Sequence, residues 1–480
     1  MTFAGGKQAG PEQAPAGSGD AGRRVLIKGG AVLSMDPQVG DFAAADVLIE
    51  GDTVAAVGPN LDASGAAVID ARGMIVMPGF IDTHHHHFET ALRNFLPDGI
   101  LVNDGHPHGA VNYYDHILQK FSLVYRPQDV YISELFGSLA QLDTGVTSVM
   151  DVSQIHHSPE HSDAVVKALR DAGRRSVFGY FEGWGEGTKY PEDARRLRKE
   201  YFSSDDQLLT MVMGGEIYIP DYEKSWKIGR DIAVPVALHV VGTFGMASTF
   251  DEIAKAGWFG PDNIFIHMTG MSDLAWKTAA DAGAHVSLAV PIEMAMRHGM
   301  PPLQKALDLG MQPSLSSDVE CTMTADPFTL MRSAFTLQRA FVNEAALAGK
   351  DRLPELLTCR DVIRFATREG AKGLRLDGKT GSLTPGKQAD VILLDATAIN
   401  TTPLNHVPGA VVTLMDRSNV DTVLVAGKIR KWRGQLLDAD LAKLRRELEA
   451  SRDYLFNAAG IPQELFREAP AAVPEPAKGA

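Results

Sequence analysis

The pattern of hydrophobic and polar positions divides the chain into two kinds of region, one of short strands and turns and one of alternating strands and helices. Residues 24–77 and 381–435 carry short apolar runs or alternations bounded by glycine, proline and asparagine, which is typical of strands joined by turns. The predicted strands are 25–27, 45–49, 54–57, 391–394, 411–414 and 420–425, with a hairpin turn at 426–428. Neither piece completes a sheet alone, so we predict one composite β-sandwich built from both chain ends.

Residues 78–380 alternate predicted strands with helical stretches. Together with the strand that precedes His84, eight strands are expected, the others being 147–150, 176–180, 209–213, 234–238, 264–266, 284–288 and 312–315. Eight strand–helix units over about 300 residues favour a closed α/β barrel of the (β/α)8 type. An open doubly wound sheet would place a glycine-rich phosphate loop after the first strand, but histidines occupy that place.

The chain ends are predicted to be simpler. Residues 436–467 hold a C-terminal amphipathic helix whose leucines recur at helical spacing, and we expect it to pack across the sandwich or at a dimer interface. Residues 1–23 and 468–480 are poor in large apolar side chains and are predicted to be disordered tails.

Composition excludes several functions. The net charge of −14 argues against nucleic acid or an anionic membrane surface as a partner, because both attract clustered lysine and arginine. Two cysteines make neither a disulfide framework nor a cysteine-rich zinc site. No apolar run approaches the ~20 residues of a membrane span, and no signal peptide is recognised, so a cytoplasmic location is expected.

Four consecutive histidines, residues 84–87, follow a short apolar run at 75–77 and a Pro-Gly bend. In an extended chain, residues two apart point to the same side, so the rings of His84 and His86 face together and can share a divalent metal ion. A purification tag or a surface loop is the simpler interpretation. A tag lies at a terminus, however, whereas this run lies directly after a predicted buried strand.

Three further predicted barrel strands end in a metal-binding side chain, namely His239, His267 and Asp318. A lone histidine after a strand is usually structural, but catalytic groups of such barrels gather at the carboxyl ends of the strands. Three imidazoles and a carboxylate hold a divalent ion that acidifies bound water. Asp318 can then accept and return a proton, and His267 can stabilise an oxyanion.

These residues resemble the amidohydrolase superfamily, specifically its cytosine deaminase-like and chlorohydrolase-like branch. The resemblance covers nearly all of the chain after residue 23. It is carried by segments 78–86, 145–148, 316–318, 366–371 and 381–390 together with His239 and His267.

The resemblance implies one divalent ion, zinc or iron, on His84, His86, His239 and Asp318, with His267 near the substrate. It also implies hydrolytic removal of ammonia, an amine or chloride from a heterocycle, or opening of a cyclic amide. Assembly as a homodimer or a larger homo-oligomer is implied as well.

One departure from the family pattern matters. Deaminases of this branch carry a proton-shuttling glutamate three residues after the histidine of the fifth strand, whereas His239 is followed by Val240, Val241 and Gly242. General acid help of this kind contributes about 10²- to 10⁴-fold to the rate. Glu216, Glu182 and Glu320 are the candidate replacements, either as proton shuttle or as a ligand bridging to a second metal, although loop glutamates are more often solvated or paired.

Aromatic and histidine side chains near the strand ends suggest a pocket for a planar heterocyclic or aryl substrate. Phe88, His156 and Trp184 are its candidate lining residues, although such rings equally often pack loops on the barrel rim.

We therefore predict a metal-dependent hydrolase of non-peptide C–N bonds, with deamination of an amino-substituted heterocycle first. Hydrolysis of an amide, carbamate or lactam comes second, because the leaving amine can take its proton from Asp318. A non-catalytic barrel with a structural metal is the third alternative.

Overall fold

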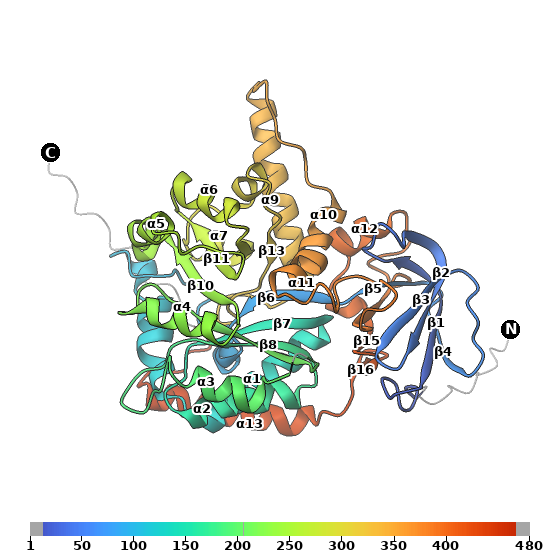
Figure 1. The fold of residues 1–480 in the computed structure, drawn as a ribbon, viewed down its shortest axis with the longest axis horizontal. Coiled ribbons are helices and arrows are strands. Elements are labelled where there is room, and N and C mark those ends of the chain that lie inside the picture. Colours follow the sequence, from blue (N-terminus) through green and yellow to red (C-terminus); the bar gives the residue numbers. More distant parts are fainter. Residues whose placement is uncertain (1–12, 205, 467–480) are drawn as a thin grey trace.

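The computed structural model describes residues 13–204 and 206–466 and consists of two bodies side by side (Figure 1). The smaller body is a mixed nine-stranded sheet that both ends of the chain build, with the order β17-β16-β15-β14-β5-β1-β2-β3 and β4 paired to β1. Its strands are β1 (Arg24–Leu33), β2 (Asp41–Glu50), β3 (Thr53–Gly58), β4 (Ala66–Asp70), β5 (Met74–Pro78), β14 (Val391–Asp395), β15 (Val420–Val425), β16 (Lys428–Trp432) and β17 (Gln435–Leu436).

The two chain ends meet where β5 pairs antiparallel with β14, at Val76 opposite Leu393. One hydrophobic cluster draws buried side chains from both halves of this sheet, including Val25, Leu393 and Ile429. The prediction of a composite β-domain is confirmed.

The larger body is an eight-stranded parallel barrel, as predicted. Its strands follow one another in sequence order and are β6 (Phe80–His85), β7 (Val146–Ser153), β8 (Arg175–Tyr180), β9 (Leu209–Gly214), β10 (Val236–Val241), β11 (Asn263–Thr269), β12 (His285–Leu288) and β13 (Ser314–Leu315). A parallel bridge between His85 and Asp318 closes the barrel from β13 to β6.

Helices surround the barrel, and α9 projects from it at the top of Figure 1. The α-helices are α1 (Pro127–Asp143), α2 (Pro159–Asp171), α3 (Ala194–Tyr201), α4 (Tyr222–Asp231), α5 (Ala247–Lys255), α6 (Asp273–Asp281), α7 (Val290–Ala295), α8 (Leu303–Asp308), α9 (Pro327–Leu347), α10 (Cys359–Arg364), α11 (Gly370–Gly373), α12 (Val407–Gly409) and α13 (Leu441–Ala458). Short 3-10 turns used below are η1 (His87–Leu92) and η5 (Gly242–Phe244). No helix in the described part of the chain is long and apolar enough to cross a membrane.

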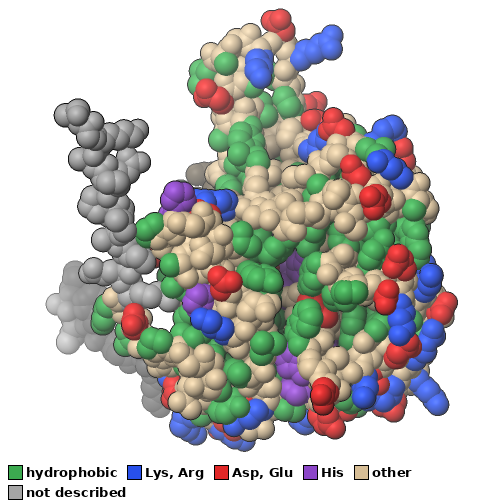
Figure 2. All heavy atoms as spheres, turned by 90° about the vertical axis from the view of Figure 1, so that its left-hand side faces the viewer, with side chains coloured by type: hydrophobic (Ala, Val, Ile, Leu, Met, Phe, Trp, Pro, Cys, Tyr) green, Lys and Arg blue, Asp and Glu red, His purple; other side chains and the backbone are tan. Residues whose placement is uncertain are grey.

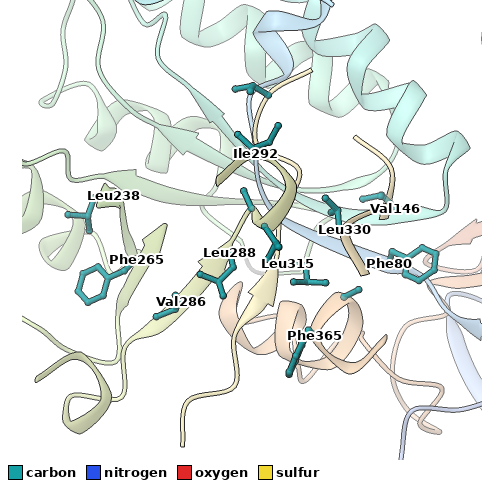
Figure 3. Close-up of a cluster of buried hydrophobic side chains, with 14 of the residues drawn as sticks. Phe80, Val146, Leu238, Phe265, Val286, Leu288, Ile292, Leu315, Leu330 and Phe365 are labelled. Carbon is teal, nitrogen blue, oxygen red and sulfur yellow. The ribbon is translucent and has the colours of Figure 1, made fainter. Parts of the chain in front are cut away.

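Side chains alternate along the barrel strands and thereby form two hydrophobic cores, one inside the barrel and one between the strands and the helices. Ala237, Ile264 and Ile266 belong to the cluster inside the barrel. Their neighbours Leu238 and Phe265 face outward, toward the layer between strands and helices that Figure 3 shows. Burying such a leucine or phenylalanine contributes roughly 1.5–3 kcal/mol, so the strand directions, and with them the site, are firmly specified.

The Pro78-Gly79 bend separates the two sheets. β5 ends at Pro78 in the mixed sheet, and β6 begins at Phe80 in the barrel. A Cβ atom at Gly79 would lie 2.2 Å from the Thr147 side chain. Only glycine therefore lets the chain pass this close to β7 and turn into the barrel.

One local prediction in the β-domain is wrong. Residues 411–414 form part of a π-helix (Ala410–Leu414) rather than a strand, since the Nδ1 of His406 caps α12 just before it and the Thr413 hydroxyl donates to the Gly409 carbonyl. A short apolar run does not distinguish a buried helix from a strand.

The ends also differ from expectation. Residues 13–23 form turns on the β-domain, where Ile429 N–H donates to the buried Ser18 hydroxyl at 3.0 Å. The rest of the predicted tails, residues 1–12 and 468–480, lies outside the described residues. Helix α13 packs on α1 and η1 of the barrel rather than across the sandwich, and its buried Ser451 donates to Asp129.

Candidate metal centre

The end of β6 delivers two imidazoles to one point. His84 and His86 are buried, and their Nε2 atoms lie 2.9 Å apart. The rings of His85 and His87 lie together on the other side of the strand, 4.5 Å between centroids.

The backbone that closes the barrel fixes Asp318 beside this pair. Asp318 N–H donates to the His84 carbonyl at 3.0 Å, and His86 N–H donates to the Asp318 carbonyl at 2.9 Å. The carboxylate Oδ1 then lies 3.6 Å from His84 Nε2 and 3.5 Å from His86 Nε2. Asp318 has a φ of 60°, a strained value for a non-glycine residue that is typical of functional sites.

Strand β10 supplies the third imidazole. His239 comes two residues after the inward-facing Ala237 and therefore points into the barrel. Its Nε2 lies 3.0 Å from His84 Nε2, and its Nδ1 donates to Glu216 Oε1 at 2.6 Å. Glu216, which we expected as the first choice for a proton shuttle, orients this imidazole.

His267 reaches the site through a bulge in β11. The pairing with β10 slips after His267, and His267 and Met268 have φ values of 70° and 51°. By simple alternation His267 would face outward, next to the inward-facing Ile266; the bulge turns it inward. Its Nε2 lies 3.7 Å from Asp318 Oδ2, and its Nδ1 lies 3.0 Å from Glu293 Oε1 on α7.

Burial sets the charge of the imidazoles. It lowers the pKa of His84, His86 and His267 well below the usual value, and the neighbouring imidazoles lower it further. Burial also opposes protonation of His239, but the negative Glu216 carboxylate outweighs it and raises the pKa of His239. Burial raises the pKa of Asp318 to about 7.

This donor set fits a divalent cation. Imidazole nitrogens that approach one another to 2.9–3.0 Å, beside a carboxylate, are the ligands that zinc and iron prefer. Glu216 behind His239 is the carboxylate partner that metal-bound histidines typically have.

A second buried network lies behind the His84–His87 segment. His87 Nδ1 lies 2.7 Å from Asp151 Oδ1, with Glu134 close by. The Arg174 guanidinium donates to His87 Nε2 and to the Gln141 carbonyl oxygen. Arginine already supplies a positive charge to these carboxylates, and the hydrogen bonds of this group hold the histidine segment in place.

His86, His239 and Asp318 line a cavity of about 430 Å³, with His84 buried behind them, and Figure 2 shows histidine at the base of a hollow on this face. Its wall carries Glu182, which accepts hydrogen bonds from the Gln154 amide and the Tyr218 hydroxyl. Burial, and then the negative charge of Glu216, raises the pKa of Glu182 to about 7.

The other predicted residues take different places. Trp184 lines the cavity mouth. Phe88 lies behind His86, buried against Tyr125, and His156 is buried against the Ser162 hydroxyl; neither belongs to the cavity lining. Glu320 is paired with Arg93 at 2.8 Å and also lies outside the lining.

Several residues of the site were not predicted. Glu293 lies on α7 and His298 in the loop after it, away from the strand ends that the barrel pattern marks. Gln154 and Tyr218 contact Glu182 from loops after β7 and β9. The one available signal was proximity in sequence, since Gln154 directly follows β7 at the carboxyl end of the barrel.

Comparisons with known proteins agree with this arrangement. The model of the amidohydrolase family matches residues 75–218 and 230–430. A 5'-deoxyadenosine deaminase of Methanosarcina barkeri is 26% identical over 451 residues, covering 90% of this chain and 98% of the relative. A 5-methylthioadenosine/S-adenosylhomocysteine deaminase of Syntrophus aciditrophicus is 24% identical, with the same coverage.

Solved structures show the same fold. An adenosine deaminase from Xanthomonas campestris with bound zinc superposes with a TM-score of 0.78 at 21% identity, covering 91% of this chain and all of that one. The zinc complex of atrazine chlorohydrolase from Arthrobacter aurescens has a TM-score of 0.75 at 21% identity, covering 89% and 100%. The chain therefore belongs to the amidohydrolase family and is a hydrolase of carbon–nitrogen bonds outside peptides.

Proposed function

We propose that the protein is a hydrolytic deaminase of an amino-substituted heterocycle that uses a single zinc ion held by His84, His86, His239 and Asp318. The observation that supports this most is the convergence of these four donors, three of which line a cavity of about 430 Å³. The relatives named as deaminases of adenine nucleosides support the same reaction.

When bound, the divalent ion supplies Lewis acidity and lowers the pKa of a coordinated water toward about 7. Asp318 accepts a proton from the attacking water and returns it to the departing amine. Its second oxygen, Oδ2, faces His267 and remains available for that transfer.

His267 faces the cavity from beside Asp318. Burial raises the pKa of Glu293 well above its usual value, and its Oε1, which accepts from the Ala289 N–H, lies 3.0 Å from His267 Nδ1 and orients the ring. The opposite nitrogen, Nε2, is thereby directed toward the cavity, where its N–H stabilises negative charge that develops on the substrate.

Glu182 takes the place of the glutamate that is missing after His239. It lines the cavity, and its pKa of about 7 lets it carry a proton at neutral pH and release it to a ring nitrogen. Glu216 and Glu320 are engaged with His239 and Arg93 and are poorer candidates.

The test is ammonia release by the zinc-loaded protein from 5'-deoxyadenosine, 5-methylthioadenosine, adenosine and an aminotriazine. We expect turnover of at least one compound, and a loss of about 10²- to 10⁴-fold in Asp318→Asn. If none of them yields ammonia, deamination is rejected.

A second candidate is hydrolysis of an amide, carbamate or lactam. It is favoured by Val240, Val241 and Gly242 after His239, because a leaving amine can take its proton from Asp318 alone. Turnover of aryl amides or lactams without ammonia release from amino-heterocycles would select it.

Two further proposals concern the protein as a whole. The family resemblance supports a homodimer, which sedimentation analysis tests. The two cysteines, Cys321 and Cys359, are free thiols, which fits a reducing compartment such as the cytoplasm, and cell fractionation tests this location.

A further inference from the structure

We propose that His298 binds a neutral polar group next to the reacting carbon of the substrate, in a cavity whose lining selects substrates without a charged phosphate or carboxylate. This inference deepens the proposed function and rests on it. His298 lines the cavity beside the candidate metal centre.

His298 lacks a partner although it is buried. Its exposure is 5%, yet neither ring nitrogen has a hydrogen-bond partner in the described part of the chain. An unsatisfied buried polar group costs about 1–3 kcal/mol. A histidine that merely filled the core would bond to a neighbour, so the natural partner of this ring enters the cavity.

The ring stands where the reaction takes place. Its centroid lies 4.7 Å from that of His267, edge to face. One nitrogen of His298, one of His267 and a carboxylate oxygen of Asp318 lie within 4.8 Å of one another. A substrate group bound by His298 is therefore adjacent to the atoms that Asp318 and His267 serve.

The loop between α7 and α8 is built to hold this ring inward. Arg297 and Gly299, on either side, have φ values of 59° and 124°. A Cβ atom at Gly299 would meet Thr269 at 3.3 Å. The Thr243 hydroxyl ties the loop to η5 by donating to the carbonyls of Arg297 and His298.

The chemistry of the lining selects the substrate charge. Burial lowers the pKa of His298 to about 3, so the ring is neutral, with one donor and one acceptor nitrogen. Among the described residues that line the cavity there is no lysine or arginine, while Glu182 and Asp318 are acidic. Away from the metal, a phosphate or carboxylate on the substrate would be buried here without a compensating charge.

The experiment compares His298→Phe and His298→Asn in the zinc-loaded enzyme, with 5'-deoxyadenosine as probe. The control is His406→Asn, an exposed cap of α12 far along the chain, where asparagine also caps. We expect His298→Phe to raise KM about 10- to 100-fold with a smaller change in kcat. His298→Asn, which keeps a donor and an acceptor, recovers most of this loss.

Two readouts exclude other roles. Bound zinc per chain stays unchanged in both variants if His298 serves the substrate; loss of an ion would make it a ligand with His267 and Asp318 and overturn the proposal. Adenosine 5'-monophosphate is turned over at least about 100-fold less efficiently than adenosine. Equal turnover of adenosine and adenosine 5'-monophosphate, or an unchanged KM in His298→Phe, would also overturn it.

If the wild type releases no ammonia, the proposed function fails and the inference is decided by calorimetric binding of 5'-deoxyadenosine. The inference is supported when the wild type binds 5'-deoxyadenosine and His298→Phe binds it at least about 10-fold more weakly. It is rejected when the wild type does not bind 5'-deoxyadenosine or when both proteins bind it equally.

Discussion

The Nδ1 atom of His239 lies 2.6 Å from Oε1 of Glu216, so a glutamate at the end of β9 holds a candidate metal ligand on the neighbouring β10. This bond keeps the proton on Nδ1 and directs the lone pair of Nε2 toward His84. The same bond favours Glu182 over Glu216 as the proposed replacement for the glutamate that is missing after His239.

Replacing Glu216 by glutamine should weaken metal binding. The amide carries no charge and supports the Nδ1 proton of His239 less well, and loss of such a partner typically costs about 10- to 100-fold in metal affinity. Competition with a chromophoric zinc chelator measures this. Glu186→Gln, at an exposed position in the loop after β8, is the matched control. Equal zinc affinity in Glu216→Gln and the control would contradict the assignment.

The pH dependence of kcat/KM should reflect the ionisation of the Glu182 carboxyl. Its carboxyl has a pKa of about 7, and its role requires the protonated form, so kcat/KM should fall as the pH rises through about 7. Glu182→Gln should lower the maximum by about 10²- to 10⁴-fold and flatten this descending limb.

Glu320→Gln is the comparison for that experiment. Glu320 pairs with Arg93 outside the cavity lining, so its variant should keep the limb. A limb that persists unchanged in Glu182→Gln would assign it to another group.

The barrel fold could be predicted from the sequence because apolar runs of strand length recur along the chain, separated by helical stretches. Eight apolar runs at regular spacing, each buried on both faces, become eight parallel strands. The helical structure of residues 411–414 could not be predicted, because four apolar or β-branched residues fit either a strand or a helical turn. The cap at His406 decides between them.

The candidate site was predictable only where side chains follow directly from strand ends. His84, His86, His239 and Asp318 converge because parallel strands end at one edge of the barrel. Glu293 and His298 lie on α7 and its following loop, whose path depends on tertiary contacts such as that between Thr243 and the loop carbonyls. The true place of Phe88 and His156 depends equally on packing, since a loop ring can face the cavity or the core.

Protein stability should fall with rising pH because of Glu89. Burial, and then the nearby carboxylates of Asp318 and Glu320, raises the pKa of Glu89 to about 8, against 4.5 in an unfolded chain. Between these values the native state holds a proton that the unfolded state has lost, so the free energy of unfolding falls as the pH rises and levels off above about 8. Denaturant titrations of the wild type and Glu89→Gln measure this.

Glu89→Gln is neutral at every pH and still accepts a hydrogen bond from the Tyr113 hydroxyl. It should therefore show a shallower fall over this window, whereas the surface variant Glu186→Gln should follow the wild type. Parallel curves for wild type and Glu89→Gln would show that Glu89 is ionised in the native state.

Removing the metal should destabilise the protein as well as inactivate it. The imidazoles of His84, His86 and His239 and the Asp318 carboxylate face one another at 2.9–3.6 Å, an arrangement that a cation stabilises only in the native state. At a zinc concentration 1,000 times the dissociation constant, binding adds about 4 kcal/mol to the free energy of unfolding. A chelator should abolish turnover and lower Tm, and about one equivalent of zinc should restore both. Magnesium, which prefers an all-oxygen octahedral site, should restore neither.

Recovery that requires two equivalents of zinc would refute a single-ion centre, and an unchanged Tm after complete zinc removal would show that these four side chains do not bind the ion.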